Sequence, residues 1–238
     1  TREDIMKIKK QLGYLPEHNP LYPEMYIREY LLYLAGHYGI RGKKAKDRVN
    51  EIIDLTGLGK EKHKKISKLS KGYRQRVGLG QALIHDPEVL ILDEPTSGLD
   101  PNQIVEIRNL ISSVGKEKTV MLSTHIMQEV EAICDRVIII DHGKIKADET
   151  AAGLSKSGTT QPIHIELKEP VDENLWLKLI DISEARKIKE YTFLLASARE
   201  EDVRPDIFKF AVDNKLTILS LSEQEKSLEE VFRSLTAK

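Results

Sequence analysis

Cysteine is almost absent from this sequence, which has only Cys134 among 238 residues. A disulfide framework is therefore excluded, and a reducing compartment such as the cytosol is expected. Long apolar runs are also missing. The best ones, residues 89–92 and 137–140, have the length of a strand, whereas a membrane-spanning helix needs about 20 apolar residues. If this protein acts at a membrane, a partner must cross the bilayer.

Neither sign of charge dominates the chain. It has 37 Lys and Arg against 38 Asp and Glu, for a formal net charge of -1. No overall field therefore attracts it to nucleic acid or anionic lipid, and nucleic acid is not an expected partner. A signal peptide is not expected either, because residues 1–10 are charged throughout.

Hydrophobic spacing predicts a helical region followed by an α/β region. The chain opens on what looks like the end of a helix, so we expect that sequence ahead of Thr1 is missing. In the α/β region, apolar strands alternate with helices, which indicates a parallel sheet whose strands are buried on both faces. The predicted helices are 4–11, 22–38, 44–56, 72–85, 101–114 and 126–134, and the predicted strands are 12–15, 89–92, 119–122, 137–140 and 145–147.

A second, smaller domain is expected after residues 151–161, which are rich in Gly, Ser and Thr and are typical of a linker. Beyond them the pattern is strand, helix, two strands, helix, strand, followed by a last helix. This βαββαβ order favours a ferredoxin-like α+β domain. The predicted strands are 163–167, 185–188, 191–196 and 217–221, and the helices are 172–180, 203–214 and 227–235.

Two adjacent carboxylates, Asp93 and Glu94, follow the apolar strand 89–92. Open α/β sheets bind ligands at the carboxyl ends of their strands. Two acids there repel each other, which implies a cation or a proton transfer. Asp93 suits a Mg²⁺ shell and Glu94 suits polarising a water molecule. The alternative is a strand that ends in a solvated acidic turn.

A possible anion site lies at Ser70-Lys71-Gly72, where a helix is predicted to begin. Unpaired backbone N–H groups and the helix dipole favour a phosphate there, with Ser70 and the Gly72 amide as donors and Lys71 adding charge. The plain alternative is an ordinary serine N-cap. Two further candidates are Asp100, which also suits a helix cap, and His125, which follows a predicted strand and is alternatively structural.

Taken together, these segments resemble the ABC ATPase family in kind and in order over about residues 1–148. The segment Leu69-Ser70-Lys71-Gly72-Tyr73 resembles the signature, usually written LSGGQ. Residues 89–94 resemble Walker B with its catalytic glutamate, and residues 97–100 the D-loop. His125 resembles the switch histidine, and residues 13–17 the Q-loop. The pattern is nearest to gliding-motility and multidrug-export subunits.

The sequence departs from the family in three ways. Glu17 stands where the Q-loop has a glutamine, so that a carboxylate would face Mg²⁺. Lys71 and Tyr73 stand where the signature has a glycine and a glutamine. The sequence also has no G-x-x-x-x-G-K-[ST] phosphate loop. We therefore expect that the polypeptide does not hydrolyse ATP alone, and that an apolar edge of the sheet is exposed.

The resemblance implies a partial P-loop NTPase sheet with a helical subdomain at about 19–76, within an ATPase domain at 1–150. It also implies a linker at 151–161 and an accessory α+β domain at 162–238. It implies a transporter subunit on the inner face of the cell membrane, powering transport, with export favoured, through separate permease subunits. ATP and Mg²⁺ would be held between two subunits arranged head to tail. Glu94 and His125 would be catalytic, Asp93 and Glu17 would face the metal, and Ser70, Lys71, Gly72, Asp100 and Glu17 would contact the nucleotide.

Two other functions fit parts of the pattern. One is a non-catalytic regulatory or binding module derived from an ABC ATPase, although the presence of both Glu94 and His125 argues against it. The other is an ABC ATPase of DNA repair or translation, which is disfavoured because neither a coiled-coil insertion nor a second cassette is present. The transported substrate is not readable from these residues.

Overall fold

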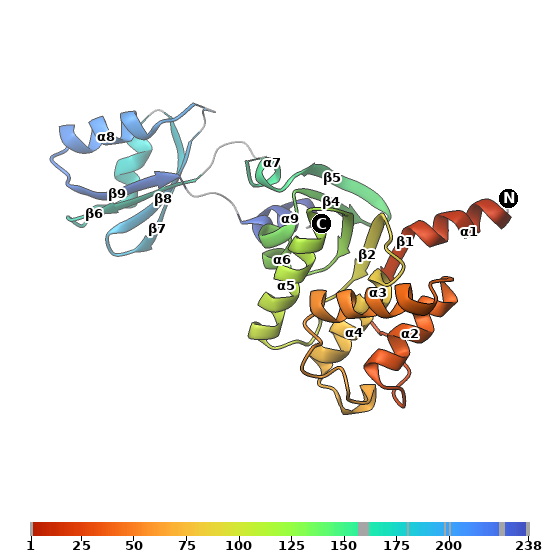
Figure 1. The fold of residues 1–238 in the computed structure, drawn as a ribbon. Coiled ribbons are helices and arrows are strands. Elements are labelled where there is room, and N and C mark those ends of the chain that lie inside the picture. Colours follow the sequence, from red (N-terminus) through yellow and green to blue (C-terminus); the bar gives the residue numbers. More distant parts are fainter. Residues whose placement is uncertain are drawn as a thin grey trace. The chain divides into compact units, whose positions relative to one another are not determined.

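A computed structural model describes residues 2–156, 162–179, 181–197, 199, 201–223 and 227–236. The chain divides into two compact units, Thr1–Ile133 and Cys134–Lys238. The elements of the first unit (Figure 1) are α1 (Arg2–Gln11), β1 (Leu12–Leu15), α2 (Ile27–His37), α3 (Gly42–Leu55), the 3₁₀ turn η1 (Ile66–Lys68), α4 (Lys71–Leu83), β2 (Val89–Asp93), α5 (Pro101–Gly115), β3 (Thr119–Ser123) and α6 (Met127–Ile133).

The first unit is built on a three-stranded parallel sheet in the order β1-β2-β3. Side chains alternate between its faces, as they must in a strand. Leu15 and Leu92 share a register position and are fully buried on one face. On the other face Tyr14 is 51% exposed and Met121 is 60% exposed. The expected exposed apolar surface is therefore present, but it lies on a face of the sheet.

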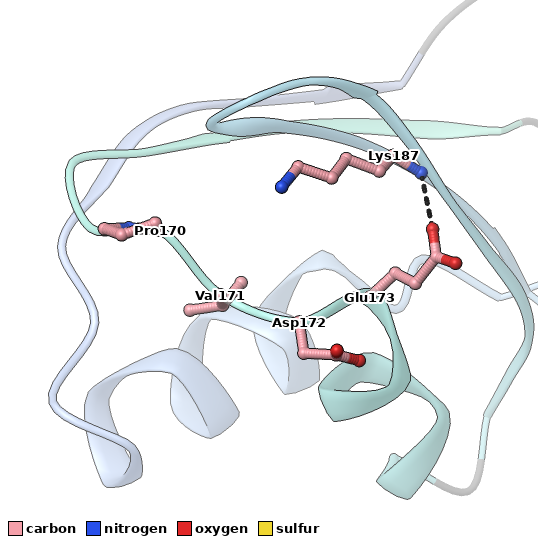
Figure 2. A pocket seen from close by; sticks show the side chains of 5 residues that line it. All are labelled: Pro170, Val171, Asp172, Glu173 and Lys187. Carbon is pink, nitrogen blue, oxygen red and sulfur yellow. Dashed lines mark hydrogen bonds between the residues drawn. The ribbon is translucent and has the colours of Figure 1, made fainter.

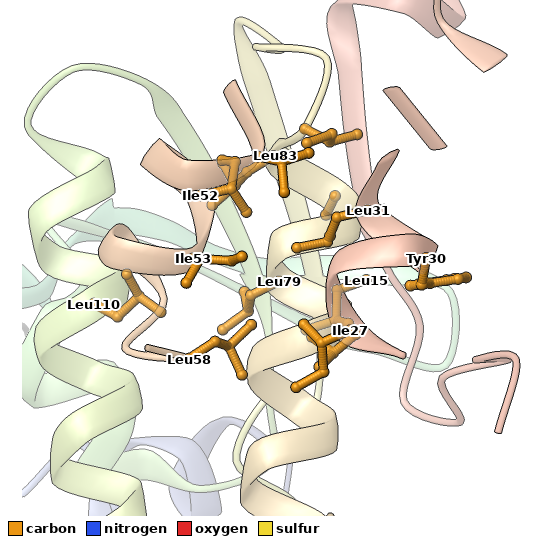
Figure 3. Close-up of a cluster of buried hydrophobic side chains, with 14 of the residues drawn as sticks. Leu15, Ile27, Tyr30, Leu31, Ile52, Ile53, Leu58, Leu79, Leu83 and Leu110 are labelled. Carbon is orange, nitrogen blue, oxygen red and sulfur yellow. The ribbon is translucent and has the colours of Figure 1, made fainter. Parts of the chain in front are cut away.

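The covered face of this sheet shares its core with helices α2, α3, α4 and α5. Figure 3 shows side chains from α2 and α3, such as Leu31 and Ile52, meeting Leu79 of α4. Leu90 of β2 is fully buried in the same cluster. Burying one such side chain stabilises the fold by about 1.5–3 kcal/mol, so this shared core holds the helical region on the sheet.

Two expectations about buried strands were wrong. Strand β3 lies at an edge of the sheet and is half exposed, because the sheet has three strands within the described residues and β3 is the last of them. Residues 137–140 do not join the parallel sheet; they belong to β4 (Arg136–Asp141), which pairs antiparallel with β5 (Lys144–Thr150). Ile138 and Ile140 are 50% and 63% exposed, so β4 is buried on one face only.

The second unit contains the β4–β5 hairpin and a four-stranded antiparallel sheet. Helix α7 (Ala151–Lys156) packs against both hairpin strands and against helix α9 (Leu228–Thr236). Helix α7 forms in the first part of the segment expected to be a linker, and residues 157–161 lie outside the described residues. The remaining elements are α7 (Ala151–Lys156), β6 (Ile163–Leu167), the 3₁₀ helix η2 (Glu173–Lys178), β7 (Ile182–Lys189), β8 (Thr192–Ser197), α8 (Arg204–Asp213), β9 (Ile218–Glu223) and α9 (Leu228–Thr236).

The four-stranded sheet has the order β7-β8-β6-β9, with every neighbouring pair antiparallel. Strand β8 thus lies between β6 and β7, which splits the first βαβ unit as in the expected ferredoxin-like topology. Its core contains the fully buried Trp176 and Phe193. The helix expected at 172–180 is the 3₁₀ helix η2, and position 180 lies outside the described part.

Most other boundaries agree with the sequence within two residues. Three elements differ by more: the strand expected at 145–147 extends to Thr150, the strand expected at 185–188 starts at Ile182, and the helix expected at 22–38 starts only at Ile27. Ahead of it, residues 22–26 run as turns and a short bridge, with Tyr26 paired to Lys65. None of the helices in the described ranges is both long and apolar enough to cross a bilayer.

Candidate functional site

Glu94 stands at the carboxyl end of β2 in a strained backbone conformation. Its φ is +45°, in the left-handed region that non-glycine residues rarely adopt. Two backbone hydrogen bonds hold it there: Glu94 N–H donates to the Ser123 carbonyl at 2.9 Å, and the Glu94 carbonyl accepts from Ser97 N–H at 3.1 Å. Such conformations cost about 1–3 kcal/mol and cluster at functional sites.

His125 meets Glu94 from the end of the neighbouring strand. The His125 backbone N–H donates a hydrogen bond to Glu94 Oε1 at 3.0 Å, and the ring atom Nδ1 is hydrogen-bonded to the same oxygen at 2.7 Å. The hydrogen bond to Glu94 and its negative charge raise the pKa of His125, with smaller contributions from Glu129 and Glu17. The ring is 77% exposed and the Glu94 side chain 15%, so Nε2 is available to a ligand.

Glu129 on α6, which the sequence did not single out, lies behind this pair. It is 1% exposed, and its carboxylate accepts hydrogen bonds from Thr96 Oγ1 and, at 3.3 Å, from Thr124 Oγ1. Thr124 Oγ1 also lies 3.4 Å from Glu94 Oε2 and accepts from Ile126 N–H at 3.1 Å. Glu129 therefore ties together the two segments that carry Glu94 and His125.

Asp93 and Glu17 were expected to face a metal. The Asp93 carboxylate is half-buried at the end of β2, and no hydrogen bond or ion pair to it is found within the described ranges. Glu17 is exposed, and its charge acts on His125. No group of three or more His, Cys, Asp or Glu side chains in the described residues could hold a metal ion. Mg²⁺ is usually held by one or two carboxylates together with phosphate oxygens and water.

The second cluster lies at the start of α4. Ser70 is its N-cap, and Oγ accepts from Tyr73 N–H at 3.4 Å. Ser70 and Lys71 are exposed, but Gly72 is buried. The side chain of Gln103, from α5, covers Gly72. A methyl group added at Gly72 would overlap Gln103 Oε1 and lie 2.6 Å from Gln103 Cδ. The plain N-cap and the proposed phosphate donor are both compatible with Ser70.

The turn of residues 97–100 packs against this cluster. Asp100 caps α5, with Oδ1 accepting from Gln103 N–H at 3.0 Å. Gly98 has φ +66°, and the Lys71 side chain lies over it, with Cε 3.3 Å from where a methyl group would stand. The structure therefore brings Lys71 and Gly72 together with Gly98 and Asp100 in one chain.

A hollow of about 430 Å³ lies elsewhere, in the second unit (Figure 2). Its acidic side chains serve local structure. Asp172 caps η2, and hydrogen bonds from Asn174 lower the pKa of Asp172. Glu173 Oε2 accepts from the backbone N–H of Lys187 at 3.2 Å. No chemistry expected from the sequence falls in this hollow.

Exposed tyrosines gather near the start of α2. Tyr22, Tyr26 and Tyr33 are 51%, 47% and 52% exposed. The Tyr22 ring lies 5.7 Å from the buried Tyr30 ring and 5.9 Å from the Tyr33 ring. Burial raises the pKa of Tyr30 to about 12, and its hydroxyl bonds Gln81. Three half-exposed aromatic rings in one region are typical of a protein contact surface.

The chain is similar to proteins of one family over nearly its whole length. A family model described as "ABC transporter" matches residues 1–97. The linearmycin resistance ATP-binding protein of Bacillus subtilis (strain 168) is 32% identical over 244 residues, covering 99% of this chain and 78% of that protein. The bacitracin transport ATP-binding protein of Bacillus licheniformis is 32% identical over 245 residues, covering 98% and 76%.

A Nod factor export ATP-binding protein of a Rhizobium species is 29% identical over 97% of this chain and 74% of its own length. Among solved structures, CbiO1 of Clostridium perfringens, described as part of the ABC transporter complex CbiONQ, matches with a TM-score of 0.60 and 28% identity. That match covers 66% of this chain and 64% of CbiO1.

Proposed function

Because this chain belongs to the family of ABC transporter ATP-binding proteins, we propose that it is the ATP-hydrolysing subunit of an exporter, with Glu94 as the residue that activates water. The observation that carries this proposal is the arrangement of Glu94. At a strand end, a mostly buried carboxylate on a strained backbone meets an exposed imidazole whose other nitrogen is available. That is the arrangement that a water molecule and a terminal phosphate need.

In the proposed reaction a water oxygen attacks the γ-phosphorus of ATP in line with the bond to the β–γ bridging oxygen. Glu94 orients this water and accepts its proton, while His125 Nε2 donates to a γ-phosphate oxygen. The new P–O bond forms as the bridging P–O bond breaks, giving ADP and phosphate. Mg²⁺, held by Asp93 and Glu17 with phosphate oxygens, would neutralise phosphate charge. Catalysis comes mainly from positioning and charge.

The second cluster would act on another subunit's nucleotide. We place Ser70, Lys71 and Gly72 against the γ-phosphate held by a second ATP-binding subunit arranged head to tail, with Asp100 at the interface. A helix N-terminus with an exposed serine and lysine suits that anion. Permease subunits would dock on the surface formed by Tyr22, Tyr26 and Tyr33. Export is favoured because one relative is named for export and another for resistance.

The domain division proposed for the chain remains 1–150 for the ATPase part, 151–161 for a connection and 162–238 for the accessory domain. We also propose that the 238 residues by themselves do not hydrolyse ATP, because no phosphate loop lies among them. The second candidate function is a non-catalytic module with the same fold, against which the presence of both Glu94 and His125 argues. A single experiment separates the two functions.

The experiment fuses a strand, a G-x-x-x-x-G-K-[ST] loop and its helix ahead of Thr1 and measures phosphate release with permease subunits present. We expect turnover in this extended chain and a loss of about 10²–10⁴-fold in Glu94→Gln, the contribution typical of a general base. An equal rate of phosphate release in Glu94→Gln would refute the role assigned to Glu94. If the extended chain and its Glu94→Gln variant both bound ATP and neither released phosphate, the result would favour the non-catalytic module.

A further inference from the structure

The signature-like segment lacks an accessible amide side chain where the LSGGQ signature that it resembles has a glutamine. Tyr73 occupies that position, and its ring packs against the hydrophobic core of the first unit. The guanidinium carbon of Arg76 lies 5.9 Å from the ring centroid. A half-buried phenol ring held in this way does not reproduce the donor and acceptor of a glutamine.

Another element brings a glutamine to the same place. The Gln103 side chain, from α5, lies directly over Gly72, with Cδ 2.6 Å and Cγ 3.3 Å from the position of an added methyl group. The backbone of Gln103 is fixed, because its N–H donates a hydrogen bond to Asp100 Oδ1 at 3.0 Å. Gly72 has no Cβ, and only that absence lets the amide come so close.

The Gln103 amide is also free to bind. It is half-buried, and no hydrogen bond to its side-chain atoms is found among the residues that the structure describes. The exposed Ser70 and Lys71 lie on the same helix tip, where anions are favoured. An amide N–H beside them is well placed to donate to a phosphate oxygen.

We propose that Gln103 supplies the amide that Tyr73 does not, and that its Nε2 donates to a phosphate oxygen of the nucleotide held by the second subunit. This proposal rests on the function proposed above. It assigns a nucleotide contact to α5, outside the signature-like segment itself. The competing explanation is that Gln103 only fills space over Gly72.

The test uses the extended chain in a Glu94→Gln background, in which bound ATP is not consumed. The measured quantity is the ATP concentration that gives half-maximal dimer by light scattering. We expect Gln103→Ala to raise this concentration about tenfold, a typical loss for one hydrogen bond to a charged group. Gln103→Glu should raise it further by repelling the phosphate. The control Asn109→Ala, exposed on the same helix, should leave it unchanged.

A space-filling role gives a different pattern. In that case Gln103→Ala and Gln103→Glu would form dimer as the parent does, whereas Gly72→Ala would be impaired and Gly72→Ala with Gln103→Ala would be restored. Either result overturns the proposal. Equal thermal unfolding of parent and variants excludes a folding defect. Failure of the Glu94→Gln parent to dimerise at any ATP concentration would instead count against the proposed function.

Discussion

The backbone N–H and the ring Nδ1 of His125 converge on a single oxygen of Glu94, Oε1, at 3.0 and 2.7 Å. This double contact fixes the imidazole relative to the carboxylate and leaves Glu94 Oε2 beside Thr124. Thr124 Oγ1 lies 3.4 Å from that second oxygen, so both oxygens of the carboxylate have a neighbouring donor. The role proposed for this pair, in which Glu94 orients a water molecule and His125 contacts a phosphate, depends on this arrangement.

The His125–Glu94 pair predicts a pH dependence. The Glu94 carboxylate raises the pKa of His125, so their attraction stabilises the fold below the ordinary histidine value and is lost as pH rises through the raised one. Glu94→Gln should lower the pKa of His125 in an NMR titration. The titration curve of His85, whose pKa is lowered by burial, should be the same in both proteins. An unchanged His125 curve would mean that the pair does not form.

Glu129 predicts a stability effect. Glu129→Ala leaves the buried Thr96 hydroxyl without its acceptor and removes one of the two carboxylates that the half-buried Thr124 hydroxyl contacts, so we expect a loss of about 1–3 kcal/mol in urea unfolding. Glu129→Gln should lose less, because its carbonyl oxygen still accepts one hydrogen bond. Glu117→Ala, at an exposed glutamate, should stay within about 0.5 kcal/mol of the parent. An unchanged free energy of unfolding in Glu129→Ala would show that Glu129 does not hold the site together.

Sequence reasoning singled out the residues of the candidate site but not the residues that support them. Asp100-Pro101 and the strand before Glu94 carry strong local signals, a cap with a first-turn proline and a short apolar run, and both appear in the structure. Glu129 has no such signal, since its burial depends on the packing of α6 and on hydroxyls about 5 and 33 residues away in sequence. The contact between Gln103 and Gly72 likewise depends on how helices α5 and α4 pack, which no local sequence signal gives.

The error at residues 137–140 has a related cause. An apolar run of this length predicts a strand, but it does not say which strand pairs with it. The tight turn at His142 and Gly143, both with positive φ, directs β4 into a hairpin with β5. Local turn chemistry therefore decided this pairing, and the signal was present in the sequence.

The 238-residue polypeptide should bind ATP weakly. The described site offers Asp93, Glu94 and His125, two of them negatively charged, and no phosphate loop lies in the sequence to supply backbone donors. Isothermal titration with Mg²⁺-ATP should show no binding in the micromolar range, whereas the chain extended with a phosphate loop should bind. Micromolar affinity in the shorter polypeptide would contradict this prediction.

The uncovered face of the parallel sheet should cause the same polypeptide to self-associate. Tyr14, Ile91 and Met121 lie side by side in register on that face, and two of them are more than half exposed. Contiguous apolar patches of this kind promote association. Met121→Lys should shift the molecule towards monomer in analytical ultracentrifugation. Val105→Lys, at an equally exposed site on α5, should not.

Gly98 and Gly39 form a matched pair for testing how firmly Lys71 is held. Both have positive φ, +66° and +82°, so an alanine at either position is strained by roughly 1 kcal/mol. Only Gly98 has a neighbour, the end of the Lys71 side chain. Because that end is flexible, we expect Gly98→Ala to cost about as much as Gly39→Ala in chemical unfolding. A clearly larger cost that disappears in Gly98→Ala with Lys71→Ala would show instead that Lys71 is fixed over the turn. In that case the lysine would be a rigid connection between the start of α4 and residues 97–100, rather than a mobile cation free to meet a phosphate.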